Sequence, residues 1–230
     1  MKYKTDSGEL WLGDCLELMK EIPDGSVDLV LTDPPYGMNY VSNRRKVEYE
    51  KIENDTEIFW LDRFVDECHR VLSDNTSIYM FCSWHKIDIF KQSIERKFNL
   101  KNIIVWVKNN HGSGDLEGSY APKHEFVIFA HKGRSKFRGK RIPDVMNFPR
   151  VDGNKSVHPT EKNVDMLKLF VKNSSNKRQT VIDPFMGSGT TGIACKVLER
   201  QFIGIELNET YFNISKKRFE ETNLLTSFFE

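Results

Sequence analysis

The sequence lacks the patterns that mark membrane-spanning, secreted or zinc-binding proteins. No apolar stretch approaches the roughly 18 residues that a membrane span requires, and the first residues lack the apolar segment of a secretory signal. Cys15, Cys68, Cys82 and Cys195 are scattered, with no C-x-x-C pair. We therefore expect reduced, mostly buried thiols in a cytoplasmic protein with no metal site and no membrane partner.

An excess of charge of one sign is also absent, since the formal net charge is +1. The content of 39% hydrophobic and 29% charged residues is ordinary for a soluble protein with a sizeable core. A length of 230 residues suits one domain with an inserted segment, and no internal repeat or long low-complexity tract occurs.

Short β-rich runs alternate with amphipathic segments along most of the chain. Strands are expected at Glu9–Leu12, Asp28–Leu31, Ser77–Cys82, Ile103–Val107, Phe126–Ala130, Thr180–Ile182 and Phe202–Glu206. Helices are expected at about Leu16–Ile22, Phe59–Leu72, Lys86–Phe98, Glu161–Val171, Thr191–Leu198 and Glu209–Glu221. This alternation predicts an α/β fold with a doubly wound, mostly parallel sheet. Such sheets bind ligands beyond the carboxyl ends of their strands, near the topological switch point.

The motif Asp33-Pro34-Pro35-Tyr36 directly follows one of the expected buried strands. Asp33 can accept a hydrogen bond from an exocyclic amino group. The Pro34 carbonyl, which the fixed φ of proline holds stiffly, can accept a second. Tyr36 offers a face on which a base can stack. The motif therefore suits a flat ring that carries an amino group, and a Pro-rich turn after a strand is the alternative.

A second motif runs from Val181 to Thr191 and contains a Gly-rich turn between a strand and a helix. Gly187 and Gly189 allow a tight turn and a close approach of backbone to ligand. Glu206 ends the next strand, about 20 residues on, where dinucleotide-binding folds place an acid that holds ribose hydroxyls. The turn is neither G-x-G-x-x-G nor a P-loop. A cofactor with ribose and no phosphate, such as S-adenosylmethionine, therefore fits better than NAD or ATP, and a structural Gly turn is the alternative.

Together the two motifs resemble those of β-group DNA amino-methyltransferases, in which the catalytic tetrapeptide precedes the cofactor loop. Three further segments resemble blocks of this family: Gly13-Asp14, Phe81-Cys82-Ser83 and His158-Pro159-Thr160-Glu161-Lys162. The last block usually continues with proline. Asn163 stands here instead, so the helix that follows is expected to start slightly differently. The resemblance covers nearly the whole chain.

The resemblance implies the seven-stranded fold of S-adenosylmethionine-dependent methyltransferases. It also implies direct in-line methylation of an exocyclic nitrogen in double-stranded DNA, with the target base flipped out. It assigns catalysis to Asp33, Pro34, Pro35 and Tyr36. It assigns cofactor binding to Asp14, Cys15, Asp33, His158, Thr160, Lys162, Asp183, Phe185, Gly187, Ser188, Gly189, Thr190 and Glu206.

The first motif residue separates the possible substrates. In this family Asp usually accompanies adenine and Ser usually accompanies cytosine, so Asp33 favours adenine N6 and leaves cytosine N4 as the alternative. RNA and protein-amide methyltransferases typically carry Asn at this position. A catalytically silent DNA-binding module is a further alternative, against which the intact motifs count.

Two basic segments are candidate DNA contacts. The segment Lys132–Lys155 is basic and irregular, and it occupies the place of the family's target-recognition segment. Its candidate residues are Arg134, Lys136, Arg138, Lys140 and Arg141, for which a solvated charged face is the alternative. Arg44, Arg45 and Lys46 lie in an expected mobile loop from Met38 to Thr56, for which a plain surface loop is the alternative.

These features predict one methyltransferase domain over residues 1–230. Its catalytic half spans 1–131, its target-recognition segment about 132–156, and its cofactor-binding half 157–230. Trp84 and Trp106 are expected in the core. The family resemblance is also compatible with a homodimer and with a cognate restriction endonuclease in the same system.

Overall fold

The computed structural model of the chain describes residues 1–36, 59–112, 117–150 and 162–222. Some of the sequence predictions lie outside the described residues. They are the loop from Met38 to Thr56 with Arg44, Arg45 and Lys46, and the cofactor residues His158 and Thr160.

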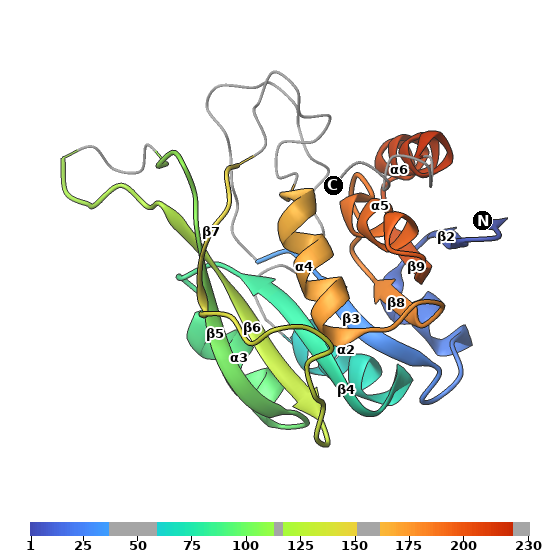
Figure 1. The fold of residues 1–230 in the computed structure, drawn as a ribbon, viewed down its shortest axis with the longest axis horizontal. Helices are drawn as coiled ribbons and strands as arrows, with labels where there is room; N and C mark the ends of the chain where they lie inside the picture. The colour runs from blue at the N-terminus through green and yellow to red at the C-terminus, as the bar shows by residue number, and fades with distance from the viewer. Residues whose placement is uncertain (37–58, 113–116, 151–161, 223–230) are drawn as a thin grey trace.

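The strands of the described ranges form one nine-stranded sheet in the order β1-β2-β9-β8-β3-β4-β6-β5-β7 (Figure 1). They are β1 (Lys2–Thr5), β2 (Gly8–Leu12), β3 (Val27–Thr32), β4 (Leu72–Cys82), β5 (Asn99–Val107), β6 (His124–Lys132), β7 (Val145–Asn147), β8 (Thr180–Asp183) and β9 (Gln201–Glu206). The strands from β2 through β9, β8 and β3 to β4 are parallel. Strand β6 is antiparallel to both β4 and β5, and β1 is antiparallel to β2.

All seven strands that the sequence predicts are present, and the doubly wound, mostly parallel sheet is confirmed. Strand β4 begins at Leu72 instead of Ser77. Two short edge strands, β1 and β7, were not predicted, and the prediction that Lys132–Lys155 is irregular is wrong at β7. Strand β7 has only three residues, paired with Val105–Val107 of β5, which is too short for a periodic pattern to show.

Helices cover both faces of the sheet. They are α1 (Cys15–Leu18), α2 (Phe59–Val71), α3 (Ile87–Glu95), α4 (Val164–Ser174), α5 (Thr190–Val197) and α6 (Glu209–Glu221), and a 3-10 turn, η1 (Met19–Glu21), follows α1. Helices α1 to α3 pack on one face, and α4 to α6 pack on the other (Figure 1). No helix within the described ranges is both long and apolar enough to cross a membrane.

Each central strand supplies side chains to both layers, because successive side chains of a strand point to opposite faces. In β3, Val30 belongs to the core on the α2 and α3 side, whereas Leu29 and Leu31 belong to the core under α4 to α6. All three are fully buried. Burial on both faces explains the continuous apolar run that leads into the Asp33 motif.

The core predictions for individual residues have different outcomes. Trp106 is 1% exposed, as predicted, and the four cysteines are free and buried. The prediction that Trp84 is core is wrong, since it is 51% exposed. Trp84 lies just beyond the end of β4, where its ring stacks on His85 with centroids 3.6 Å apart. A strand that ends there leaves the next side chain at the rim of the sheet.

Asn163, the residue that departs from the family pattern, caps helix α4. Its side-chain oxygen accepts hydrogen bonds from the backbone N–H groups of Asp165 (2.9 Å) and Met166 (3.1 Å). Asparagine is among the best N-cap residues, whereas proline has no side-chain acceptor for these donors. The helix therefore runs from Val164 to Ser174, later than the Glu161–Val171 expected from the sequence.

Gly189 joins β8 to α5 and requires the absence of a side chain. It is the N-cap of α5 with φ +81°, a left-handed conformation that disfavours residues with a Cβ. A Cβ added there would also lie 2.8 Å from Cβ of Ser215 in α6. The tight turn that the sequence predicts is thus fixed both by backbone conformation and by helix packing.

Replacing Gly189 by alanine should lower the free energy of unfolding by about 2 kcal/mol, because strain at positive φ adds to crowding against Ser215. Urea unfolding followed by circular dichroism measures this loss. Gly112→Ala is the control, because the position is exposed and has no positive φ, although a Cβ would lie 3.2 Å from Cγ of Pro122. It should cost less than about 1 kcal/mol. Equal losses in the two variants would contradict the account.

Candidate active site

The two sequence motifs meet at the carboxyl ends of neighbouring strands. Strands β3 and β8 pair in parallel, with Leu29 opposite Val181. Asp33 directly follows β3, and Asp183 is the last residue of β8. Both motifs therefore lie at one edge of the sheet, beside the point at which the strand order reverses.

Glu206 ends β9 next to the Gly-rich turn. Its Oε2 accepts a hydrogen bond from the backbone N–H of Gly187 (2.9 Å), and its Oε1 accepts one from Asn208 (2.8 Å). Burial raises the pKa of the Glu206 carboxyl, while the backbone donors act in the opposite direction. The turn and the acid are thus one unit, in which each carboxylate oxygen keeps a further lone pair for a ligand.

The Gly13-Asp14 segment reaches the same unit from β2, because the N–H of Gly13 donates to the carbonyl of Glu206 at 2.9 Å. The side chain of Asp14 caps α1 by accepting from the N–H of Leu16 at 2.7 Å. Cys15 is buried in the core on the α2 side, where burial raises the pKa of its thiol to about 12. The structure brings Asp14 near Glu206 and turns Cys15 toward the core.

Asp183 acts inside the turn. It is 4% exposed, and its carboxylate accepts from the hydroxyl of Thr191 (2.7 Å) and the N–H of Phe185 (3.2 Å). Burial raises its pKa to about 7, against the effect of these donors. In α6, Arg218 holds the carbonyl of Ser188 at 2.8 Å. Asp183 and Arg218 therefore stabilise the shape of the turn from within.

Phe185 is held from the other layer of the fold. Its ring packs edge-on against Phe64 and Trp60 of α2, with centroids 5.0 and 5.9 Å apart. Half-buried at the strand end, it links the Gly-rich turn to α2. Helix α2, from the N-terminal part of the chain, thus fixes Phe185, a predicted cofactor residue.

Both carboxylate oxygens of Asp33 have partners. The ammonium group of Lys162, which lies just before α4, is 2.9 Å from Oδ2. The hydroxyl of Tyr36 donates to Oδ1. The Tyr36 ring packs edge-on against Phe90 of α3 at 6.1 Å. The structure therefore brings together the predicted catalytic Asp33 and Tyr36 and the predicted cofactor residue Lys162.

The ion pair continues to two residues that sequence reasoning missed. Lys162 Nζ lies 2.8 Å from Oε2 of Glu125 in β6, and Oε1 of Glu125 pairs with Lys108 beyond the end of β5. We call Asp33, Lys162, Glu125 and Lys108 the charge chain. Only the sheet pairing could have revealed it, since β6 is antiparallel and its first residues lie beside the end of β4.

The charge chain is largely shielded from solvent. The exposed fraction of its side chains ranges from 10% for Lys162 to 25% for Asp33. Burial by itself raises the pKa of Glu125, but the ammonium groups of Lys162 and Lys108 outweigh it and lower the pKa to about 2. Burial likewise opposes the charge of Lys162, but Asp33 and Glu125 raise its pKa above the usual range. The two carboxylates beside Lys162 and the two ammonium groups beside Glu125 thus favour the ionised forms of these residues.

The basic segment after β6 is not brought to Asp33. Because β6 is antiparallel to β4, its last residue Lys132 pairs with Thr76, at the sheet end opposite the Asp33 motif. From there the chain crosses the lower part of Figure 1 toward the end of α4, where the N–H of Arg138 donates to the carbonyl of Asn173 at 2.8 Å. The predicted DNA contacts Arg134, Lys136, Arg138, Lys140 and Arg141 thus follow a turn remote from the carboxyl edge.

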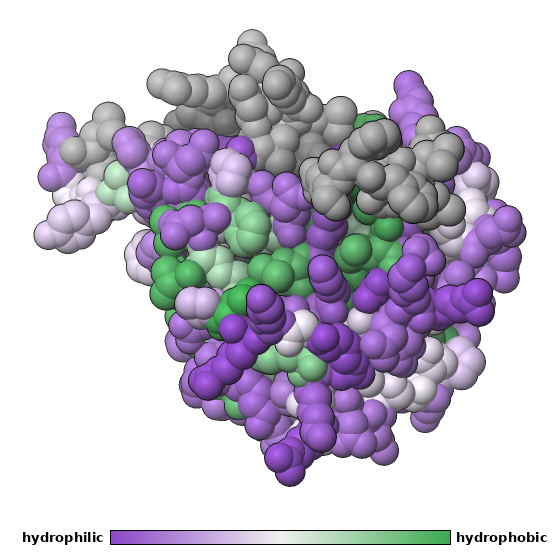
Figure 2. Space-filling model, viewed as in Figure 1, coloured by the Kyte–Doolittle hydropathy of each residue, from purple (hydrophilic) through white to green (hydrophobic). Residues whose placement is uncertain are grey.

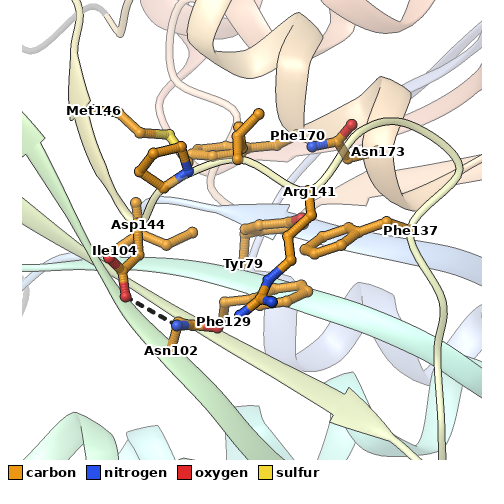
Figure 3. Close-up of a pocket in the computed structure, with 12 residues that line it drawn as sticks. Tyr79, Asn102, Ile104, Phe129, Phe137, Arg141, Asp144, Met146, Phe170 and Asn173 are labelled. Carbon is orange, nitrogen blue, oxygen red and sulfur yellow. Dashed lines mark hydrogen bonds between the residues drawn. The ribbon is translucent and has the colours of Figure 1, made fainter.

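This segment lines a separate pocket of about 410 Å³ between α4 and β7 (Figure 3). Phe137 stacks on Phe129 of β6 with centroids 5.5 Å apart, and the side chain of Arg141 lines the pocket beside them. Figure 2 shows apolar side chains gathered on this face between α4 and β7. The pocket contains none of the predicted catalytic or cofactor residues, and the chemistry of the motifs belongs to the carboxyl edge.

The lowered pKa of Glu125 predicts a particular loss of stability in acid. A carboxyl with a pKa of about 2 in the folded state and 4.5 as its ordinary value stabilises the fold above pH 4.5. That contribution is lost as the pH falls from 4.5 toward 2. Glu125→Gln should therefore flatten the decline of the free energy of unfolding over this range, measured by urea titration at several pH values.

The control for this measurement is Glu95→Gln, which removes an exposed ion pair with Lys91 on α3 and should keep the wild-type dependence on pH. An unchanged slope in Glu125→Gln would contradict the proposed pKa of Glu125.

Comparison with known proteins shows similarity to DNA methylases. The family model described as DNA methylase, of the N6/N4 type, matches residues 27–217. The DNA adenine methyltransferase YhdJ of Escherichia coli (strain K12) is 30% identical in an alignment 254 residues long with gaps included, which covers 95% of this chain and 85% of YhdJ. The type II methyltransferase M2.MboI of Moraxella bovis is 29% identical over 238 residues, which cover 92% of this chain and 87% of M2.MboI.

Solved structures show the same fold. The M1.HpyAVI–SAM complex superposes with a TM-score of 0.71 at 28% identity, covering 91% of this chain and 98% of that one. The cytosine-N4-specific PvuII DNA methyltransferase superposes with a TM-score of 0.76 at 21% identity, covering 96% and 89%. These likenesses confirm the predicted methyltransferase fold and its cofactor. The chain belongs to the DNA methylase family of N6/N4 amino-methyltransferases, and its cofactor is S-adenosylmethionine.

Proposed function

We propose that this protein is a site-specific adenine-N6 methyltransferase that acts on double-stranded DNA with the target base flipped out of the helix. The observation that supports this most is the position of Asp33, an acceptor for an amino group, on the strand beside the cofactor turn. Its relative YhdJ is named a DNA adenine methyltransferase. Asp at the first motif position favours adenine within the family.

The residues at the carboxyl edge fit S-adenosylmethionine. Gly187 and Gly189 have φ values of 51° and 81°, and the absence of a Cβ at each lets the backbone approach a ligand closely. Glu206 keeps lone pairs for the two hydroxyls of a ribose. When bound, the cofactor supplies an electrophilic methyl group on a sulfonium centre. We assign Glu206 to the ribose and Phe185 to packing against the cofactor.

Asp33 and Pro34 orient the target nitrogen. The lone pair of an exocyclic amino group is delocalised into the ring, which makes the nitrogen a poor nucleophile. If its two N–H groups donate to the Asp33 carboxylate and the Pro34 carbonyl, the nitrogen is drawn toward tetrahedral geometry and its lone pair becomes available. The remaining contribution is orientation of that lone pair in line with the electrophile.

Tyr36 changes partner when the base enters. Its hydroxyl now occupies Oδ1 of Asp33, the oxygen that Lys162 leaves free. An incoming amino group replaces this hydroxyl with another donor, so Asp33 keeps a full set of hydrogen bonds. The Tyr36 ring is then available to stack on the base.

Cytosine N4 is the second candidate target. Its exocyclic amino group presents the same two N–H donors, and the cytosine-N4-specific PvuII enzyme has the same fold. The acceptors at Asp33 and Pro34 suit either base, so these two groups do not distinguish adenine from cytosine.

The product of the reaction distinguishes these candidates. The protein is incubated with duplex DNA and S-adenosylmethionine labelled in the methyl group, and the DNA is digested to nucleosides and separated by mass. We expect the label in N6-methyladenine. Label in N4-methylcytosine, or no labelled nucleoside, would refute the proposal. Sequencing of modified positions then gives the recognition site.

Asp33→Ala should lower the single-turnover rate of methyl transfer by about a hundredfold or more, because the main acceptor for the target amine is lost. DNA affinity, measured by fluorescence anisotropy, should stay within about threefold of wild type. Asp24→Ala is the control, since the Asp24 side chain is 80% exposed and pairs with Arg70, and its rate should be unchanged. Retained turnover in Asp33→Ala would refute the mechanism.

A further inference from the structure

Glu125 and Lys108 are far from the Asp33 motif in the sequence. Both nevertheless belong to the charge chain that ends on Asp33. We propose that they are positioning residues for methyl transfer. Glu125 holds the Lys162 ammonium at Oδ2 of Asp33, and so reserves Oδ1 for the target amino group. This inference rests on the proposed function of the site.

The position of the Lys162 ammonium is closely defined by its neighbours. Of its three N–H groups, two face Oδ2 of Asp33 at 2.9 Å and Oε2 of Glu125 at 2.8 Å. The ring of Phe81 lies 4.7 Å from the nitrogen, a distance at which a cation is attracted to an aromatic face. Since the side chain is only 10% exposed, water does not compete effectively. The Trp106 ring lies 5.9 Å from the same nitrogen. Two carboxylates and two rings therefore determine where the ammonium lies.

Sharing the ammonium between two carboxylates is what keeps one oxygen of Asp33 available. Without the charge of Glu125, Asp33 would be the sole carboxylate partner of Lys162. The ammonium would then be drawn between both oxygens of Asp33, in competition with the target amine. Glu125 thus acts on the reaction through Lys162, without contact with Asp33 itself.

Lys108 completes the arrangement from the outer side. It pairs with Oε1 of Glu125, and its Nζ lies 5.0 Å from the ring of Trp106. With two carboxylates and two ammonium groups the charge chain is neutral overall, which suits its shielded position. Lys108 also saturates the second oxygen of Glu125, so that this carboxylate does not attract the target amine in place of Asp33.

The charge chain connects residues that are far apart in the sequence. Lys108 follows β5, Glu125 lies in β6, Asp33 follows β3 and Lys162 precedes α4. Cys82, at the end of β4 between them, has its thiol pKa raised to about 12 by burial and by the nearby carboxylates of Asp33 and Glu125. It is therefore a neutral neighbour and adds no charge to the network.

The test separates the rate of chemistry from binding. Glu125→Gln, which keeps shape and removes charge, is compared with wild type in single turnovers at saturating DNA and S-adenosylmethionine. We expect the rate constant to fall by about tenfold to a hundredfold, since a misplaced acceptor costs this much. Dissociation constants for cofactor and for DNA, measured by calorimetry and anisotropy, should stay within about threefold.

Two further variants grade the effect. Glu125→Asp keeps the carboxylate, so its rate constant should lie between those of Glu125→Gln and wild type. A merely structural role would not rank the rate constants in this way. Lys108→Met should slow transfer by about threefold or more, with binding unchanged. Glu95→Gln removes an exposed Lys–Glu pair on α3 of similar length (2.7 Å), and its rate should match that of wild type.

The outcomes distinguish this inference from the proposed function. If wild type labels no nucleoside in DNA, the proposed function fails. If wild type is active and Glu125→Gln keeps its rate within twofold, or if its cofactor affinity falls in parallel with the rate, the positioning role is refuted. Should thermal unfolding show that Glu125→Gln does not fold, an unchanged rate in Lys108→Met and Glu125→Asp refutes it equally.

Discussion

The parallel pairing of β3 with β8 is the contact on which the site depends. It joins strands about 150 positions apart in the sequence and places their carboxyl ends side by side. The residues proposed to bind the base and the cofactor lie together because of this adjacency, since Asp33 directly follows one strand and the Gly-rich turn follows the other. The aliphatic side chains of β3, buried on both faces, hold the pairing in register.

Two links tie the halves of the protein together above this pairing. On one side of the sheet, Phe185 of the cofactor turn packs against Phe64 and Trp60 of α2. At the rim, Lys162 just before α4 pairs with Asp33 and Glu125 from the N-terminal part of the chain. One link is apolar and the other ionic. Because the ionic link is largely shielded, salt should screen it less than it screens the exposed pairs of the helices.

Most of the fold could be predicted from the sequence, since strands and helices carry their own periodic signals. The motifs at Asp33 and Gly187 were placed correctly because Pro and Gly mark strand ends locally. Glu125 could not be identified, since its role depends on the antiparallel pairing of β6, which leaves no local pattern. For the same reason the position of the basic segment after Lys132 could not be predicted, because the antiparallel strand β6 places it at the sheet end opposite Asp33.

The hydrogen bond from Tyr36 to Asp33 has a consequence for selectivity. An acceptor that already holds a phenol gains nothing from a solvent molecule, because one donor merely replaces another. A ligand gains binding free energy only if it also offers a flat surface on which the released Tyr36 ring can stack. In the proposed function, the site without substrate therefore has its hydrogen bonds satisfied, and a broad aromatic base, unlike water or a small amine, can displace the Tyr36 hydroxyl.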